Sequence, residues 1–298
     1  MAQLDRPRET LLAGLIGRGI AASRTPRMHM AEGGAQGLSS VYRILDMDAP
    51  ERAELSLSDM LKAAEASGFD GLNVTYPFKI EVMGLLDDLS ENARTIGAVN
   101  TVVLKDGRRV GHNTDLWGFA QSFRTGLPEV PRDHALLIGA GGAGVAVAHA
   151  LADCGVRRLS IHDSDPDRAE RLAAQVAANR PETTTAAVAD LAALFETDRP
   201  DGLVNATPMG MAKLPGMALP AALLDPALWV ADIVYFPLET ELLRAARAAG
   251  CRVLPGSGMA VLQAVRAFEL FTGRPADPAR MAATFDTFDH PAPIAAGT

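Results

Sequence analysis

The string Gly139-Ala140-Gly141-Gly142-Ala143-Gly144 limits the folds open to this chain, because it joins two predicted elements of different kinds. A buried apolar strand is predicted from His134 to the first glycine, and a helix over residues 142–154. In that setting the first glycine permits a tight turn, the second lets backbone approach a pyrophosphate, and the third allows close helix packing. The helix start offers N–H groups to phosphates. We therefore expect these residues to bind a dinucleotide; a glycine-rich turn without a ligand is the alternative.

The C-terminal half of the chain continues with strands and helices in alternation. After the helix over residues 142–154, a strand is predicted over 157–163 and a second helix over 166–178. Further strands are predicted over 184–188, 202–205, 229–235 and 251–254. Several of these strands are continuous apolar runs, which is typical of a parallel sheet covered on both faces by helices. The pattern predicts a Rossmann-type doubly wound α/β domain.

The residues outside this predicted Rossmann-type domain are expected to form a second domain, which a length of 298 residues also favours. Strands are predicted over residues 11–17, 40–45 and 71–74, with a loop between the first two, a helix over 57–66 and another helix starting at Pro77. Residues 98–111 resemble a hairpin turning at Asp106-Gly107, and a helix from Asn113 or Thr114 links the domains. Two helices, over 259–271 and 278–285, precede a polar tail over 289–298 that we expect to be frayed.

Asp163 indicates which dinucleotide is bound. It ends the second strand of the glycine-rich unit, 19 residues after Gly144, where a carboxylate accepts hydrogen bonds from an adenosine ribose and repels a 2′-phosphate. No arginine follows it directly, so NAD is favoured. Arg168 is the nearby basic residue that keeps NADP open.

Charge and cysteine content bear on partners and location. Lysine and arginine total 28 against 36 aspartate and glutamate, a net charge of −8 without a basic cluster, so we expect neither nucleic acid nor a membrane surface as a partner. The apolar run of seven residues before Arg18 is too short for a signal-peptide core or a membrane span. The two cysteines form no CxxC, so we expect no metal site and a reducing cytoplasm. We expect a monomer or homodimer.

Several ordered motifs extend the argument to the whole chain. They are Ser23-Arg24-Thr25-Pro26, Asn73-Val74-Thr75-Tyr76-Pro77-Phe78-Lys79, Ala98-Val99-Asn100-Thr101, Gly111-His112-Asn113-Thr114-Asp115, Asn205-Ala206-Thr207-Pro208-Met209-Gly210-Met211, Asp232-Ile233-Val234-Tyr235 and Gly256-Ser257-Gly258-Met259 through Gln263. Together they closely resemble the shikimate dehydrogenase family, over about residues 11–285. The resemblance implies an N-terminal substrate domain, residues 1–117 completed by 257–298, a dinucleotide-binding domain over 118–256, and an active site in the cleft between them.

The resemblance also implies roles for individual residues. Lys79 matches the family's catalytic lysine and Asp115 its partner. Oxidation of a secondary alcohol requires a group that takes the hydroxyl proton while hydride leaves for the nicotinamide, and a lysine held in a cleft can do this. By sequence alone the two residues are a surface lysine and a helix cap, and which of them carries the proton stays open.

The same matching assigns the ligand contacts. Ser23 and Thr25 match the hydroxyl pair that holds the substrate carboxylate, and Tyr235 matches an aromatic hydroxyl near that carboxylate. The groups that contact the ring hydroxyls are matched by Thr75, Asn100 and Gln263. Further cofactor contacts are expected at Thr207, Ile233, Gly256 and Met259. For these polar side chains, local turn or cap chemistry is the alternative.

Two departures from the family pattern narrow the expected activity. The chain has Ser23-Arg24-Thr25-Pro26 where shikimate-specific members usually read Ser-x-Ser-Pro, and Asp163-Ser164-Asp165 where NADP-linked members usually read Asn-Arg-Thr. Both favour the NAD-dependent quinate/shikimate dehydrogenase branch, which interconverts quinate or shikimate and the 3-dehydro acids. The alternatives are an NADP-linked shikimate dehydrogenase of aromatic amino-acid biosynthesis, another two-domain dehydrogenase, or a non-catalytic regulator of the same fold.

Overall fold

The computed structural model describes residues 9–287, so the predicted frayed tail lies outside the described residues. The chain divides into two compact units, each with a six-stranded sheet. The first unit contains the described residues up to Thr114 and those from Ala264 onward, and the second is Asp115–Gln263. Both boundaries fall inside helices, α4 (Thr114–Gly126) and α9 (Ser257–Thr272). The changes of domain predicted from the sequence are at 117/118, which also lies in α4, and at 256/257, directly before α9.

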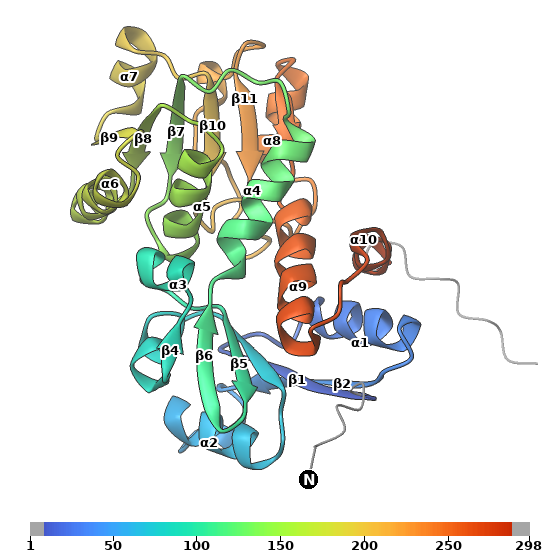
Figure 1. Ribbon diagram of the computed structural model, residues 1–298. Helices are drawn as coiled ribbons and strands as arrows, with labels where there is room; N and C mark the ends of the chain where they lie inside the picture. The colour runs from blue at the N-terminus through green and yellow to red at the C-terminus, as the bar shows by residue number, and fades with distance from the viewer. Residues whose placement is uncertain (1–8, 288–298) are drawn as a thin grey trace, which may run out of the picture. The chain divides into compact units, whose positions relative to one another are not determined.

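The first unit contains a mixed sheet in the order β2-β1-β3-β5-β6-β4 (Figure 1). Its strands are β1 (Thr10–Gly17), β2 (Ser39–Asp46), β3 (Gly71–Val74), β4 (Asp88–Leu89), β5 (Thr101–Lys105) and β6 (Arg108–His112). Strand β1 pairs in parallel with β2 and β3, and β5 runs antiparallel to β3 and β6. The predicted hairpin is confirmed, with Asp106 and Gly107 both at positive φ, as a tight two-residue turn requires.

Helices cover this sheet on both faces. Helix α2 (Leu57–Ala66), predicted to the residue, begins with a capping box between Ser56 and Asp59 and buries Leu61 in one core. The end of α9 buries Phe268 and Phe271 in a second core, with alternate β1 residues. The unit also contains α1 (Thr25–Ala35), α3 (Glu91–Ile96), α10 (Pro278–Asp286) and two 3₁₀ helices, Pro50–Arg52 and Glu81–Leu85.

Two sequence predictions fail in this unit. The predicted loop after β1 contains α1, whose start is marked by Pro26 and whose Gly33-Gly34 pair obscures the helical pattern. The helix predicted to start at Pro77 is instead a turn, closed by the Phe78 N–H donating to the Thr75 carbonyl at 2.9 Å, and then a 3₁₀ helix. A proline at the first helical position also fits a tight turn, and the following residues make short-range bonds of the 3₁₀ type.

The second unit is the predicted doubly wound domain. Its strands are β7 (His134–Ile138), β8 (Arg158–His162), β9 (Thr184–Ala187), β10 (Gly202–Asn205), β11 (Trp229–Asp232) and β12 (Arg252–Leu254). They are all parallel in the order β12-β11-β10-β7-β8-β9, so the chain reverses direction across the sheet between β7 and β10. Ligands of such sheets bind outside the carboxyl ends of the strands at this switch point.

Helices lie on both faces of this parallel sheet. They are α5 (Gly142–Asp153), α6 (Pro166–Asn179), α7 (Leu191–Thr197) and α8 (Glu241–Ala248), with most of α4 and the start of α9, and a 3₁₀ turn occurs at Ala221–Leu223. Helices α7 and α8 bury Phe195 and Leu242 against one face. On the other face, Phe123 of α4 meets Trp229 edge-on, with ring centroids 5.0 Å apart. Strand β11 ends three residues earlier than predicted, because the Val234 N–H turns back to the Asp232 carboxylate.

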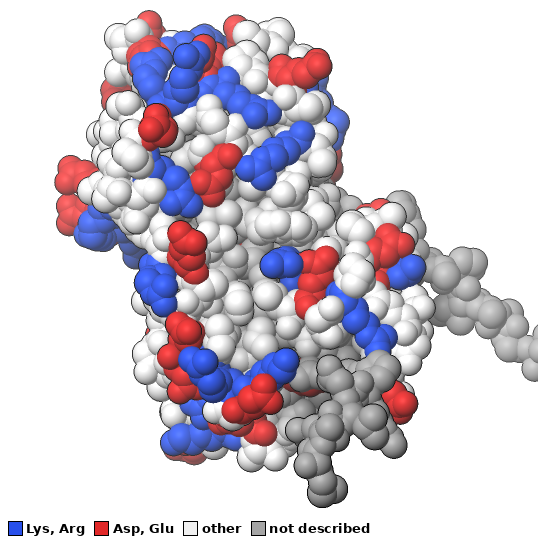
Figure 2. All heavy atoms as spheres, in the orientation of Figure 1, with Lys and Arg blue, Asp and Glu red and all other residues white. Residues whose placement is uncertain are grey.

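Charges are mixed on the face drawn in Figure 2, where basic and acidic side chains lie next to one another in both units. Many arginine side chains are paired with nearby carboxylates, for example Arg158 with Asp198 and Arg180 with Asp153. Within residues 9–287, no helix has the length and hydropathy needed to cross a membrane.

Candidate active site

The glycine loop lies at the switch point of the parallel sheet. Gly139 has a φ of +106°, and a Cβ placed on it would lie 2.8 Å from the Ala206 backbone. A Cβ on Gly144 would lie 2.0 Å from the Gly139 carbonyl oxygen. Gly141 caps α5 without a side chain, and a Cβ placed on Gly141 or Gly142 would point into open space. These glycines therefore form a close-packed cradle that offers backbone donors to phosphates.

Asp163 is fixed against this cradle. It directly follows β8, and its carboxylate accepts hydrogen bonds from the N–H groups of Ala140 at 2.7 Å and Asp165 at 2.9 Å. Burial opposes ionisation, but these bonds and the charge of Arg168 prevail and hold the pKa of Asp163 below its ordinary value. The group is therefore an anion beside the glycine loop. Arg168 itself pairs with Asp165 at 3.3 Å.

A second loop at this edge follows β10. The Asn205 side chain donates to Asp232 at 2.9 Å and to the Met209 carbonyl at 3.0 Å, and accepts from both the N–H and the hydroxyl of Thr207. The Thr207 hydroxyl also accepts from the Met209 N–H. The predicted cofactor residue Thr207 is thus held in a bonded loop whose position depends on Asn205.

Asp232 ends β11 at the same sheet edge, and the sequence does not predict its buried, hydrogen-bonded state. Its carboxylate is 1% exposed and accepts hydrogen bonds from Asn205, from the Thr240 hydroxyl at 2.7 Å and from the Val234 N–H. Burial raises its pKa to about 6, against the opposing effect of these three donors. A single aspartate at a strand end carries no sequence signal that distinguishes this buried role from solvent exposure.

We expect Asp232→Asn to change the pH dependence of stability. The pKa of Asp232 is about 6 in the folded protein against an ordinary 3.8, so protonation favours folding. This stabilisation is complete below about pH 4 and lost as pH rises through 6, and it amounts to about 3 kcal/mol. Urea unfolding between pH 4 and 7 should show wild-type stability falling by about this amount relative to the variant. A constant difference would contradict the buried, protonatable carboxylate.

Three other predicted cofactor residues lie close together in the second unit. Ile233, Gly256 and Met259 line one small depression with Phe119, Ser122, Ala231, Asp232, Leu254 and Pro255. A Cβ on Gly256 would lie 2.5 Å from the Ile233 carbonyl oxygen, so the two segments touch through backbone.

Predicted substrate residues of the first unit also converge. The Val74 N–H donates to the Asn100 carbonyl, and the Val99 N–H to the Lys79 carbonyl, both at 2.8 Å. These bonds hold the turn carrying Thr75 and Lys79 beside Asn100. Lys79 is half-buried.

Asn100 belongs to a buried polar chain that the sequence did not predict. Its side-chain oxygen accepts from the Thr114 N–H at 2.7 Å, and its amide donates to the Thr114 hydroxyl at 3.0 Å. Thr101 links it to Asn73, whose side chain donates to the Thr101 hydroxyl and accepts from the Tyr42 hydroxyl at 2.8 Å. These buried hydrogen bonds orient the Asn100 side chain and hold the start of α4 in place.

The remaining predicted residues are placed as follows. Ser23 and Thr25 lie where β1 leads into α1, and Thr25 is the first residue of that helix, not part of a loop. Asp115 is buried in the first turn of α4, and the Gln263 amide donates to the Ala260 carbonyl of its own helix at 3.0 Å. Tyr235 is 41% exposed. The second unit holds Asp115, Tyr235 and Gln263, and the first holds the others.

The residues present fit a pyridine nucleotide, since a side-chain-free helix start, a glycine cradle and an anionic Asp163 converge at one sheet edge. Among the described residues, no group of three or more His, Cys, Asp or Glu could hold a metal ion.

Comparison with known proteins gives the same assignment. The Shikimate dehydrogenase substrate binding domain family matches residues 15–102, and the Shikimate 5'-dehydrogenase C-terminal domain family matches residues 256–284. A shikimate dehydrogenase (NADP(+)) of Streptomyces avermitilis is 51% identical over 278 residues, covering 92% of this chain and 94% of the relative. A quinate/shikimate dehydrogenase (NAD(+)) of Corynebacterium efficiens is 48% identical over 278 residues, covering 93% and 98%.

A solved structure agrees with these relatives. The quinate dehydrogenase from Corynebacterium glutamicum in complex with NAD has a TM-score of 0.89 and 46% identity, covering 93% of this chain and 99% of that one. The chain therefore belongs to the shikimate dehydrogenase family, as an oxidoreductase of the shikimate and quinate dehydrogenases that uses a pyridine nucleotide.

Proposed function

We propose that the protein oxidises quinate and shikimate to their 3-dehydro acids with NAD, and that it catalyses the reverse reductions. The observation that carries the choice of NAD is the Asp163 carboxylate, bonded to the glycine loop through Ala140. A fixed anion there accepts hydrogen bonds from the ribose hydroxyls and repels a 2′-phosphate. Arg168, the basic residue that could favour NADP, is paired with Asp165. The NAD-named relatives support the proposal.

In this proposal Lys79 takes the hydroxyl proton of the substrate and Asp115 stabilises the charge that results. Bound NAD supplies the hydride acceptor. Ser23 and Thr25 hold the carboxylate, Tyr235 lies near it, and the ring hydroxyls contact Thr75, Asn100 and Gln263. The first unit acts as the substrate domain and the second binds the cofactor through residues 139–144, Asp163, Thr207, Ile233, Gly256 and Met259. The family resemblance supports these roles.

Product analysis tests the reaction. Purified protein incubated with quinate and NAD at alkaline pH should yield an acid two hydrogens lighter than quinate, together with NADH. Recovery of unchanged quinate from this incubation, and of unchanged shikimate from a parallel one, would contradict the proposal.

A shikimate-specific, NADP-linked dehydrogenase is the second candidate, because the Streptomyces relative carries that name at 51% identity. Asp163 distinguishes the two. We expect Asp163→Asn to lower the NAD-to-NADP ratio of kcat/KM by about tenfold or more, since a hydrogen bond to a charged group contributes about 1.5 to 3 kcal/mol. The asparagine oxygen can still accept from Ala140, so the loop should persist. Steady-state kinetics with both nucleotides measure the ratio.

Asp167→Asn is the matched control. It removes the same charge from an exposed position in the first turn of α6 and should leave the ratio within twofold of wild type. Equal ratios for the two variants would remove Asp163 from cofactor selection.

Thr25→Ser should shift the substrate preference towards shikimate. Quinate carries a tertiary hydroxyl on a saturated carbon where shikimate has a ring double bond, and Thr25 shapes the wall facing that carbon in the proposed site. Leaving the extra hydroxyl unpaired costs about 1 to 3 kcal/mol, enough for about tenfold in specificity. The kcat/KM values for the two acids measure the ratio, and an unchanged ratio would show that Thr25 does not select between them.

A further inference from the structure

Arg24 lies between the two hydroxyl residues proposed to hold the substrate carboxylate, yet its side chain is only 5% exposed. Its Nη1 donates to the Phe285 carbonyl at 3.2 Å, and its Cζ lies 4.7 Å from the centroid of the Phe285 ring. Phe285 is 1% exposed and lies near the end of α10. The guanidinium is therefore used to bind the last described helix, by a hydrogen bond and a cation–π contact.

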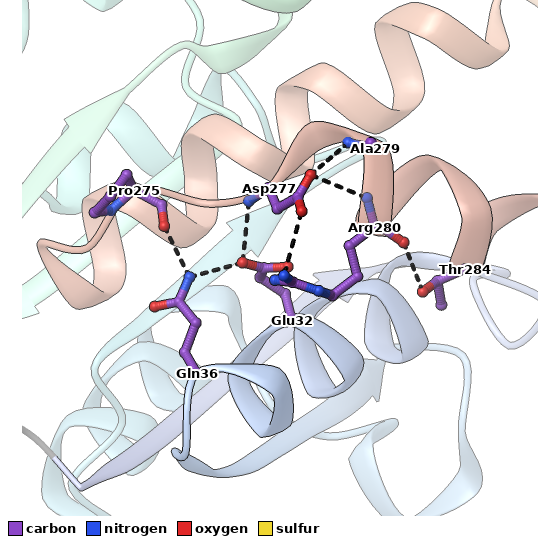
Figure 3. A network of polar contacts seen from close by, with 7 residues as sticks. All are labelled: Glu32, Gln36, Pro275, Asp277, Ala279, Arg280 and Thr284. Atoms are coloured by element: carbon purple, nitrogen blue, oxygen red, sulfur yellow. Dashed lines mark hydrogen bonds and ion pairs between the residues drawn. The ribbon is translucent and has the colours of Figure 1, made fainter.

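Helix α10 is fixed to α1 at a second point (Figure 3). Glu32 of α1 is fully buried and accepts from Arg280 at 2.8 Å, from the Gln36 amide at 2.7 Å and from the Asp277 N–H at 3.0 Å. The start of α1 thus meets the end of α10, and Glu32 meets the start of α10, so the two helices run antiparallel. An ion pair with several hydrogen bonds to its buried carboxylate is a rigid attachment.

The segment between β1 and α1 is fixed at its other end by Asp46. The carboxylate of Asp46 accepts from the N–H groups of Gly19 and Ile20, both at 3.0 Å, and the Ser23 N–H donates to the Ile20 carbonyl at 3.0 Å. The Ser23 hydroxyl accepts from the Thr25 N–H at 3.3 Å, which leaves its own proton to be donated.

We propose that Arg24 is a positioning residue that sets the two carboxylate-binding hydroxyls by attaching their backbone to α10. The inference rests on the proposed function, because Ser23 and Thr25 are carboxylate contacts only there. Helix α10 thereby becomes a part of substrate binding that does not itself contact substrate.

Arg24→Met should raise KM for both quinate and shikimate by about tenfold or more, since small displacements of positioning groups have effects of up to about 10²-fold. We expect kcat to change less than about threefold and KM for NAD to stay near wild type, because the carboxylate contact is the same in ground and transition states. Arg24→Lys keeps a donor and a charge for Phe285 and should restore part of the affinity.

Phe285→Leu tests the other side of the contact. It keeps the carbonyl, removes the ring, and should raise the same two KM values. In the double variant the effects should not add, because both changes break one contact. Arg43→Met, which removes an exposed arginine of β2 in the same unit, is the control and should leave every KM unchanged.

Unchanged KM values for the acids in folded Arg24→Met, or additive effects in the double variant, would overturn the inference. If Arg24→Met does not fold, Phe285→Leu decides by the same criterion, so that unchanged KM values for both acids in this variant would overturn the inference. Failure of the proposed function appears separately, as absence of turnover by the unmodified protein.

Discussion

Replacing Lys79 by methionine should lower kcat for quinate and shikimate oxidation by about 10² to 10⁴, the usual contribution of a positioned proton acceptor. The fold should tolerate the change, because the bonds that hold this turn are backbone ones, in which the Val99 N–H donates to the Lys79 carbonyl and the Val74 N–H to the Asn100 carbonyl. NAD affinity should stay nearly constant, since the residues proposed to bind NAD lie in the second unit. Initial rates at saturating NAD measure kcat, and calorimetric titration with NAD measures its affinity.

Two companion variants sharpen this test. Lys62→Met removes an exposed lysine of α2 in the same unit and should leave kcat unchanged. Asp115→Asn should also reduce kcat strongly, because in the proposed mechanism its carboxylate stabilises the charge that forms when Lys79 takes the substrate proton. A Lys79 variant with full kcat would remove this residue from the mechanism.

Gly144→Ala should destabilise the second unit and weaken NAD binding together. The new methyl group would lie 2.0 Å from the Gly139 carbonyl oxygen, which belongs to the backbone and cannot move aside as the end of a flexible side chain could. Overpacking of this kind costs about 1 to 3 kcal/mol, so we expect a lower Tm and a Kd for NAD raised by about tenfold to 10²-fold. Thermal unfolding and calorimetric titration measure the two effects.

Gly142→Ala is the matched control for the stability effect. It makes the same substitution two residues earlier, where no protein atom lies within 4 Å of the new Cβ, and should leave Tm near or above wild type. Equal Tm losses in both variants would show that close packing of Gly144 does not explain the loop.

The parts of the fold predicted best are those whose signals are local. Helix α2 has its own capping box, and β10 is a short apolar run between polar residues, so both match their predicted bounds. Helix α1 was missed because its face is interrupted by two glycines and its stability depends on Glu32 and α10, which lie far apart in sequence. The prediction of a helix starting at Pro77 is wrong because proline is common both at the first position of helices and in turns.

The residues of the candidate site also differ in whether a local sequence signal predicts them. The glycine loop and Asp163 are predicted from the sequence because a strand, a turn and a helix follow one another at fixed spacing, and the structure places the two side by side through the bond from the Ala140 N–H to Asp163. The polar chain through Tyr42, Asn73 and Thr101 joins three different strands, and no spacing within the sequence relates them. Arg24 stood inside a quoted motif, but its role depends on Phe285, 261 residues away. Long-range contacts of this kind follow from topology.

Initial rates at 340 nm test whether the protein oxidises both acids with NAD. The unmodified protein is assayed with quinate and shikimate against NAD and NADP, and kcat/KM is measured for each of the combinations. We expect turnover of both acids with NAD, and kcat/KM for NAD above that for NADP by about tenfold or more. A preference for NADP, or shikimate oxidation without measurable quinate oxidation at saturating NAD, would contradict the account.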